Sequence, residues 1–306
     1  MTCDIIMPAR NQEHTLPRVI AALSRQKLTA GDRLRLILAD DGSTDGTSAV
    51  ARRACRSGRL DLKIIDTHRR GAAAARNLAL EQAAADIVLL LGADIILRPA
   101  AVARHFALHR RETAMRAAGL GMVRWDPRLS PTPFMEWLIH GGPQNNFDAL
   151  LGISTAPPAQ YWYASHLSAK AGLLRGCTFN ETFTGYGWED LELGRRLQTA
   201  GCTLYVLHEA IGLHTHRYSA ADIFRRQAAA GRQLPRYQQL HPAVRLLPVR
   251  SLRGRIKQHL LVQSGAHAAL KLLLKHTGSR VTTPRLFSLA ADTEFWQGVK
   301  QELRLK

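Results

Sequence analysis

The first hundred residues alternate short runs of β-branched residues and leucine with alanine-rich stretches, and this alternation restricts the possible folds more than any other feature. It predicts four strands, at 4–8, 34–39, 62–65 and 87–91. Helices are expected between them, after Thr15, after Asp45 and over 72–84. This order is typical of a parallel sheet covered on both faces. The sequence therefore predicts an α/β fold with a mostly parallel, doubly wound sheet.

Clusters of polar residues follow three of these strands. ARN follows the first strand, DDGS the second and GAD the fourth. Open sheets of this kind bind ligands beyond the carboxyl ends of their strands. We therefore expect the three clusters to face one ligand site.

The DDGSTDGT segment has two interpretations. A carboxylate such as Asp41 at a strand end can accept hydrogen bonds from a pyrimidine N–H and a ribose hydroxyl. The same residue types are also common in plain turns and helix caps. The segment alone does not decide between nucleotide binding and a turn.

Asp94 ends LLLGAD, the most hydrophobic strand, where an uncompensated charge is costly. Mg²⁺ and Mn²⁺ prefer oxygen ligands and often use one or two protein carboxylates together with substrate phosphates. Asp94 is thus a candidate metal ligand facing a diphosphate. A simple strand-end turn is the competing interpretation.

The segment 179–202, FNETFTGYGWEDLELGRRLQTAGC, places Glu189 and Asp190 directly after Tyr186 and Trp188. Aromatic rings can stack on sugars and carboxylates can accept protons from hydroxyls. Tyr186, Trp188 and Glu189 are therefore candidate residues for binding a sugar acceptor. Transfer with inversion needs a general base near the acceptor hydroxyl, and we assign that role to Asp190. Acidic residues also favour a helix start, but this alternative does not account for GYGW.

Downstream, GLHTHRYS brings His214 and His216 to what is predicted to be another strand end. A neutral imidazole can complete a metal site that a carboxylate begins. Isolated surface histidines usually have no such role. The position of His214 one strand after the Glu-Asp pair favours a metal ligand.

The charge of the chain is concentrated at its carboxyl end. The 306 residues carry a formal charge of +18, and 217–306 hold 17 lysines and arginines against 4 acidic residues. The stretch HLLVQSGAHAALKLLLKH is amphipathic, as in helices that lie on membranes or pack on a protein domain. An anionic membrane surface is one candidate partner.

Localisation follows from what the sequence lacks. No charged and apolar leader precedes the first strand, and no stretch approaches the ~20 apolar residues of a membrane span. The four cysteines show no zinc-site spacing. We expect a cytoplasmic protein whose membrane contact, if any, is peripheral on the inner membrane.

Together these segments resemble the family-2 glycosyltransferases of the GT-A fold, particularly bacterial enzymes of polysaccharide and lipopolysaccharide assembly. The resemblance runs from residue 3 to about 242, through IIMPARNQEHTLPRVIAAL, DDGSTDGT, GAAAARNLAL, GAD and GYGWEDLELGRRL. It implies a catalytic domain over 1–216, with a donor half to about 125 and an acceptor half over 126–216. A basic helical extension over 217–306 would follow. The loose stretch from about 132 to 162 would shape the acceptor site or act as a linker.

The resemblance also implies roles for individual residues. Asp41 and the backbone of Pro8 would contact the nucleobase of a nucleotide-sugar donor, Arg76 would help to bind that donor, and Asp94 and His214 would bind Mn²⁺ or Mg²⁺. The expected reaction is transfer, most simply from a UDP-sugar, to a glycan or lipid-linked glycan.

The chain departs from the family pattern at two positions. Gly92 replaces the first aspartate of the family's DxD motif, and His166 stands where similar enzymes often have Asn. The change at Gly92 leaves open a catalytically impaired sugar-nucleotide-binding subunit.

Two other classes fit less well. A sugar nucleotidyltransferase would carry a glycine-rich loop after the first strand, where this chain has PARNQEH. A nucleic-acid-binding protein would interleave basic and aromatic residues, but the basic tail has few aromatics. We therefore expect no nucleic-acid partner.

Overall fold

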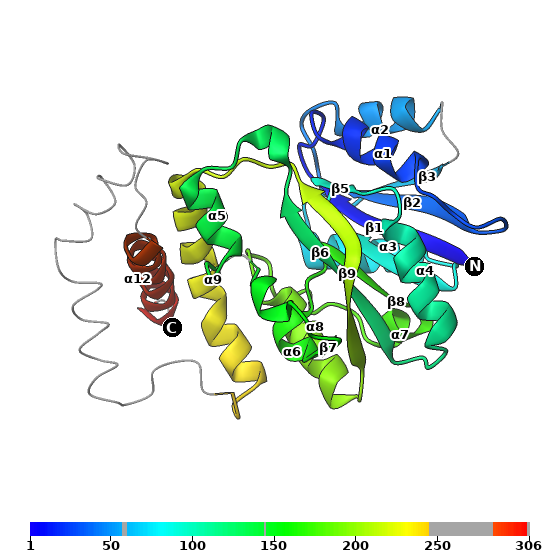
Figure 1. The fold of residues 1–306 in the computed structure, drawn as a ribbon. Coiled ribbons are helices and arrows are strands. Elements are labelled where there is room, and N and C mark those ends of the chain that lie inside the picture. Colours follow the sequence, from blue (N-terminus) through cyan, green and yellow to red (C-terminus); the bar gives the residue numbers. More distant parts are fainter. Residues whose placement is uncertain (57–59, 144, 245–283, 305–306) are drawn as a thin grey trace. The chain divides into compact units, whose positions relative to one another are not determined.

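The computed structural model describes residues 1–56, 60–143, 145–244 and 284–304 (Figure 1). Its contacts group the chain into two compact units. The first comprises 1–129, 149–184 and 189–216. The second combines 130–148 and 185–188 with 217–306, so two short segments assigned by sequence to the acceptor half group with the carboxyl-terminal part.

The first unit is built on one sheet of nine strands. Its strands are β1 (Thr2–Ala9), β2 (Arg33–Asp40), β3 (Asp61–Asp66), β4 (Ile87–Leu91), β5 (Ile95–Leu97), β6 (Ala117–Trp125), β7 (Thr155–Ala156), β8 (His166–Lys170) and β9 (Thr203–His214). The order is β3-β2-β1-β4-β8-β6-β9-β5, with β7 paired to β9. All four predicted strands are present and pair in parallel, which confirms the α/β prediction.

The second half of the sheet adds antiparallel pairing that the sequence did not predict. β8 runs antiparallel to both β4 and β6, and β5 and β7 run antiparallel to β9. β6 and β9 restore a parallel pair, with a register shift after Gly121. The sheet is therefore mixed, with its parallel part concentrated in the first four strands.

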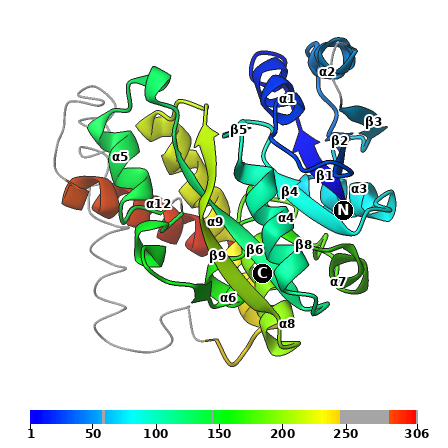
Figure 2. The ribbon, with the colours of Figure 1, turned by 45° about the vertical axis from the view of Figure 1, so that its right-hand side comes forward.

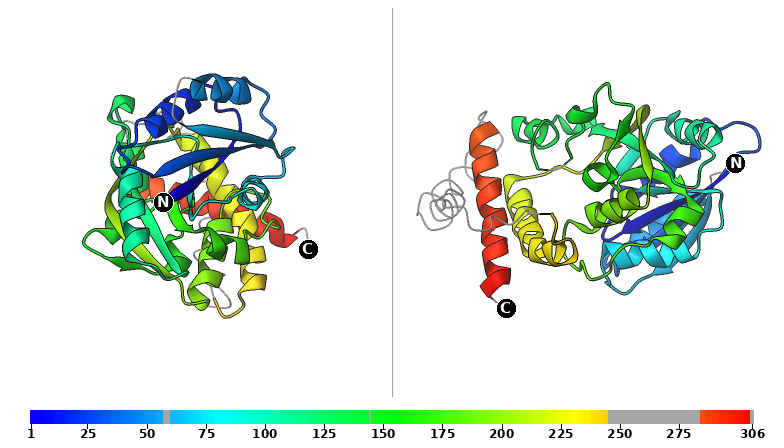
Figure 3. Two further views of the ribbon diagram at one scale, coloured as in Figure 1. Left: turned by 90° about the vertical axis from the view of Figure 1, so that its right-hand side faces the viewer. Right: turned by 90° about the horizontal axis from the view of Figure 1, so that it is seen from below.

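Helices cover both faces of the parallel part. This unit contains α1 (Leu16–Ser24), α2 (Thr47–Cys55), α3 (Ala72–Glu81), α4 (Ala101–Arg111), α6 (Pro158–Tyr161), α7 (Ala171–Gly176) and α8 (Glu189–Thr199). α1 and α2 lie on one side of β1 to β3 and α3 on the other (Figure 3), whereas α4 packs on β6 and β9 (Figure 2). β4 is buried along its whole length, as expected for a central strand with both faces covered.

Three histidines form a buried cluster between α4 and the sheet. Nδ1 of His105 and Nε2 of His109 lie 2.7 and 2.9 Å from the Ser168 hydroxyl, and Nε2 atoms of His105 and His166 lie 3.1 Å apart. The His166 ring fills the space beside Gly121, where a Cβ atom would lie 2.2 Å from it. His166 is completely buried in this cluster.

The histidine cluster makes folding sensitive to acid. Burial lowers the pKa of His109 and His166 to about 4, and burial lowers the pKa of His105 well below its usual value. Between the unfolded pKa near ~6.5 and the folded pKa, the unfolded chain binds more protons, so stability falls as pH falls. We expect a loss of up to ~1.4 kcal/mol per pH unit for each histidine.

Urea unfolding at pH 7 and pH 5 measures this loss. His166→Asn should reduce the pH dependence, whereas His14→Asn, which alters an exposed side chain, should leave it unchanged. Equal pH dependence in His166→Asn and the wild-type protein would contradict the assignment to the cluster.

The second unit contains α5 (Pro133–Ile139), α9 (Ala220–Leu240) and α12 (Pro284–Arg304). α9 and α12 lie side by side (Figures 1 and 3). Their backbones approach closely at two glycines, because a Cβ on Gly231 would lie 1.9 Å from the Phe295 carbonyl oxygen and one on Gly298 would lie 2.0 Å from that of Ala228. A capping box between Ser219 and Asp222 begins α9.

The predicted helical extension is thus present as α9 and α12, but the amphipathic stretch around 260–274 lies outside the described residues. Within the described part of the chain, every helix is too short or too polar to cross a membrane.

Candidate functional site

Pro8 and Asp41 lie together at the carboxyl ends of β1 and β2. Pro8 pairs with Ala39 in register, and the Asp41 amide donates to the Ala9 carbonyl at 2.8 Å. The Asp41 carboxylate accepts from the Thr67 hydroxyl at 2.7 Å and from the Gly71 amide at 3.1 Å. The Asp41 carboxylate therefore holds the start of α3 in place. It also lies at the end of β2, where the sequence predicted a ligand-binding carboxylate.

The rest of DDGSTDGT forms turn hydrogen bonds. Asp40 accepts from the Ser43 amide at 2.9 Å and the Ser48 hydroxyl at 2.5 Å, and Asp45 accepts from the Thr47 amide at 3.0 Å. Asp40 and Asp45 thus form the local hydrogen bonds that the turn interpretation predicts. It does not conflict with ligand binding, because it holds the strand end in a fixed shape.

Asp94 and His214 are brought together by the pairing of β5 with β9. Ile95 is the register partner of His214, and Nε2 of His214 lies 3.5 Å from Oδ2 of Asp94. The Asp94 carbonyl accepts from the amide and the hydroxyl of Thr215, both at 2.9 Å. The Trp125 ring packs edge-on against the His214 ring at 5.1 Å.

These two side chains suit a hard divalent cation that is completed by other ligands. One carboxylate oxygen and one imidazole nitrogen are an acceptable partial set for Mn²⁺ or Mg²⁺ when phosphate oxygens supply the remainder. Within the described residues no group of three or more His, Cys, Asp or Glu side chains is arranged to hold a metal by itself. Nδ1 of His214 accepts from the His216 amide at 3.2 Å. This contact favours a proton on Nε2, so metal binding through Nε2 requires the contact to open.

Gly92 stands where the family pattern has the first aspartate of DxD, and its lack of a side chain leaves space next to the Asp94 carboxylate. A Cβ atom at this position would lie 2.9 Å from Oδ1 of Asp94 and 3.1 Å from the Ile95 side chain. An aspartate at 92 would therefore displace the remaining carboxylate of GAD in this backbone conformation.

Arg76, Glu189 and Asp190 form a largely buried charge cluster in the first unit. Arg76 extends from α3, whereas Glu189 and Asp190 form the first turn of α8. Nη1 of Arg76 lies 3.5 Å from Oε1 of Glu189 and 3.4 Å from Oδ1 of Asp190. The three side chains are mostly buried, with 11, 15 and 24% of their surface exposed.

Several polar atoms of this cluster lack a hydrogen-bond partner in the structure. They are Nε and Nη1 of Arg76, Oε2 of Glu189 and Oδ1 of Asp190. Oδ2 of Asp190 is satisfied by the Ala164 amide at 2.8 Å. Because unsatisfied buried groups are costly, their convergence makes this cluster a candidate site for a ligand hydroxyl or a water.

Burial raises the pKa of both carboxyl groups. The pKa of Glu189 rises to about 7 through burial and the neighbouring Asp190, while Arg76 opposes the rise. Burial also raises the pKa of Asp190, against the effects of Arg76 and the Ala164 amide. A carboxylate of increased basicity in a buried position is suited to accept a proton.

The second unit holds the GYGW segment against α9. Nε1 of Trp188 donates to the Ala230 carbonyl at 2.9 Å, and its ring packs on Tyr237 at 4.7 Å. The Arg226 guanidinium lies 4.9 Å from the Tyr186 ring centroid, and Tyr186 remains 43% exposed. Packing on α9 thus gives GYGW a structural role that the sequence did not reveal.

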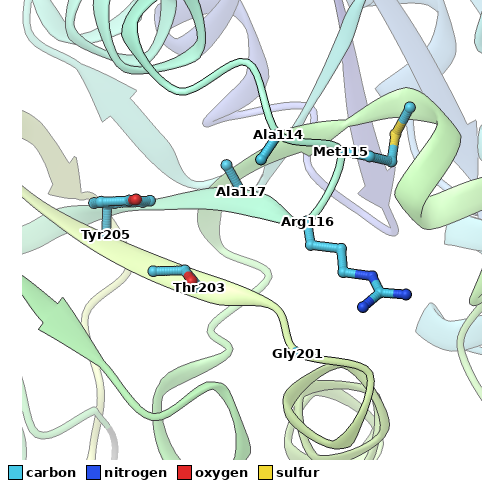
Figure 4. A pocket seen from close by; sticks show the side chains of 7 residues that line it. All are labelled: Ala114, Met115, Arg116, Ala117, Gly201, Thr203 and Tyr205. Carbon is cyan, nitrogen blue, oxygen red and sulfur yellow. The ribbon is translucent and has the colours of Figure 1, made fainter.

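A separate pocket of about 360 Å³ lies at the start of β6 and β9 (Figure 4). Met115, Arg116, Thr203 and Tyr205 contribute to its lining. His214 ends β9, so this pocket lies at the opposite end of that strand and does not include the predicted site residues.

Sequence reasoning missed the groups that hold the cluster in place. Asn77 donates to the Phe179 carbonyl and accepts from the Phe179 amide, both at 2.9 Å, and the Phe179 ring lies 5.2 Å from the Arg76 guanidinium carbon. The Ala164 amide was also missed. The available signal for Asn77 was its place directly after Arg76 in GAAAARNLAL. A backbone amide such as that of Ala164 leaves no signal in the residue pattern.

Comparison with known proteins shows the family and the fold of the chain. Glycosyl transferase family 2 matches residues 4–156, half of the chain. A "Validoxylamine A glucosyltransferase" of Streptomyces hygroscopicus subsp. limoneus is 27% identical over 234 residues, covering 68% of this chain and 50% of that protein. The "Uncharacterized glycosyltransferase YfnE" of Bacillus subtilis is 31% identical over 123 residues, covering 39% and 30%. The match thus spans about half the length of the validoxylamine A glucosyltransferase and a smaller share of YfnE.

Solved structures share the fold. "Mannosyltransferase PcManGT from Pyrobaculum calidifontis in complex with GDP-Man and Mn2+" has a TM-score of 0.62 at 18% identity, covering 99% of this chain and 87% of the other. S. aureus TarS 1-349 in complex with UDP has a TM-score of 0.55 at 16% identity, covering 100% and 92%. These likenesses confirm the predicted GT-A type of fold. With the family match over half its length, the chain belongs to glycosyl transferase family 2.

Proposed function

We propose that this protein is an inverting glycosyltransferase that moves a sugar from a nucleotide-sugar to a hydroxyl of a glycan or lipid-linked glycan. The observation that carries the proposal is the buried Glu189–Asp190 pair at the start of α8, which lies within 3.5 Å of Arg76 and in which Oε2 of Glu189 and Oδ1 of Asp190 lack a hydrogen-bond partner. Membership of family 2 supports the reaction class.

In the proposed reaction the acceptor oxygen attacks the anomeric carbon from the side opposite the nucleoside diphosphate. The new glycosidic bond forms as the bond to the diphosphate breaks, and Asp190 takes the acceptor's proton. Its Oδ2 is held by the Ala164 amide at 2.8 Å, which leaves Oδ1 for the acceptor hydroxyl. Glu189 would bind the acceptor beside it.

The donor would bind at the strand ends, with Pro8 and Asp41 against the base. Asp94 and His214 would hold Mn²⁺ or Mg²⁺, which supplies positive charge to the leaving diphosphate. Two similar structures, TarS in complex with UDP and PcManGT in complex with GDP-Man and Mn2+, support this class of donor and metal. We propose a UDP-sugar as the first donor to test.

The acceptor side is proposed from the GYGW segment. Tyr186 keeps an exposed ring that can stack on a sugar, whereas Trp188 is anchored to α9. A polysaccharide or lipopolysaccharide acceptor is the finer proposal that the GYGWED resemblance suggests.

Thermal unfolding with a panel of UDP-, GDP- and TDP-sugars, with and without Mn²⁺, tests donor binding. A ligand that binds only the folded state raises the apparent stability. We expect one nucleotide class to raise the Tm in Mn²⁺ and a smaller effect in EDTA. No shift with any nucleotide-sugar would contradict the proposed function.

We further propose that the basic segment 217–306 attaches the enzyme to an anionic inner-membrane surface, supported by its 17 basic against 4 acidic residues. Flotation with anionic vesicles should decrease as salt increases, and neutral vesicles should not bind. Absence of binding to anionic vesicles at any salt concentration would contradict this attachment.

A further inference from the structure

Arg76 is placed differently from a simple donor contact. The guanidinium extends from α3 toward the first turn of α8, where it ion-pairs with both Glu189 and Asp190. Its charged end stacks over the Phe179 ring at 5.2 Å, and Asn77 fixes the Phe179 backbone through two hydrogen bonds. Asn77, the residue after Arg76, therefore holds in place the aromatic ring that supports the Arg76 guanidinium.

The position of the Arg76 charge affects the ionisation of both Glu189 and Asp190. Two carboxyl groups adjacent in the chain repel each other when both ionise, and burial adds to the cost of each charge. Among the described residues, Arg76 is the cation that ion-pairs with them. Arg196, further along α8, binds Glu192 at 2.8 Å, and Glu181 binds Arg70 at 3.0 Å.

We infer that Arg76 is a positioning residue, which holds the Glu189–Asp190 pair in place and keeps the Asp190 carboxylate ionised for proton transfer. This inference rests on the proposed role of Asp190 as the base. It replaces the donor contact implied by family resemblance with a different function for the same side chain.

The distances fit this role. At 3.4 and 3.5 Å the guanidinium nitrogen is close enough to stabilise both charges but too far for short hydrogen bonds. A hydroxyl group that enters the cluster can accept from Arg76 and donate to Oδ1 of Asp190, both of which lack a partner in the structure. Arg76 would then orient the same hydroxyl that Asp190 deprotonates.

The sign of the pH effect follows from this arrangement. Asp190 must be deprotonated to act, so activity rises as pH rises through its pKa. Arg76 lowers the pKa of Asp190 against the effect of burial. Removing the guanidinium therefore moves the acidic limb of the pH profile to higher pH, and the loss of kcat/KM should be roughly tenfold greater at pH 6 than at pH 8.

Arg76→Met tests the inference, with Arg53→Met on the exposed face of α2 as a matched control. We expect Arg76→Met to bind the donor within about twofold of wild type, to lose kcat and to shift the acidic limb, while Arg53→Met changes none of these. Arg76→Lys keeps the charge and should restore part of the low-pH activity. Melting curves identify any variant that fails to fold, and the lysine variant then carries the test.

Two outcomes separate the possible failures. Donor affinity reduced tenfold or more, with an unchanged pH profile, would make Arg76 a donor contact and overturn the inference. Adding Arg76→Met to Asp190→Asn should cause little further loss, because Arg76 acts through Asp190, and a full additive loss would also overturn it. Normal turnover by Asp190→Asn alone would instead remove the proposed base, whatever Arg76 does.

Discussion

Asp190→Asn should reduce kcat by about 10²- to 10⁴-fold, the usual contribution of a general base. The amide keeps the shape of the side chain, and its oxygen can still accept from the Ala164 amide, which lies 2.8 Å from the carboxylate. It cannot take a proton from the acceptor. Donor binding, measured by titration with the nucleotide-sugar, should stay close to wild type.

Glu189→Gln is the matched control for Asp190→Asn. The two residues are adjacent, similarly buried and both near Arg76, and burial raises the pKa of Glu189 as it does that of Asp190. The glutamine keeps the shape of the side chain, and because Glu189 is proposed to bind the acceptor and not to take its proton, we expect a smaller loss of kcat. A turnover of Asp190→Asn near the wild-type value would exclude Asp190 as the base.

Asp94→Ala should weaken donor binding in Mn²⁺ on the order of 100-fold and reduce turnover with it. The reason is electrostatic, because the donor's diphosphate would lose the cation that Asp94 is proposed to hold. His214→Ala should act in the same direction but more weakly, as the loss of one neutral ligand. Titration of the donor with Mn²⁺ and with EDTA measures both effects.

The EDTA measurement also serves as the control. Without metal, Asp94→Ala and the wild-type protein should bind the donor equally weakly. Asp61→Ala, which removes an exposed carboxylate at the start of β3, should bind like wild type in both conditions. Unchanged donor affinity of Asp94→Ala in Mn²⁺ would show that GAD does not hold the metal.

Local sequence patterns determined the parallel half of the fold. The apolar runs at β1, β2, β3 and β4 and the helical periodicity between them specify their structure within a few residues, because periodicity acts over short distances. The predicted side-chain caps at Thr15 and Asp45 are not formed as predicted, since α1 and α2 begin without a side-chain cap hydrogen bond and the N-cap of α2 is Gly46. The antiparallel strands β8, β5 and β7 were not predictable in this way. They are short, and their pairing depends on partners far along the chain.

The site divides along the same line. The sequence by itself predicted candidate groups for the site, Asp41, Asp94, Asp190 and His214, because carboxylates and imidazoles at strand ends and helix starts are visible in the residue pattern. Only the tertiary structure decided which groups meet: Asp94 with His214 through the β5–β9 register, and Arg76 with Glu189 and Asp190 across more than a hundred residues. The physical reason is that residue type follows from local sequence, whereas distance, burial and the resulting pKa depend on how remote segments pack.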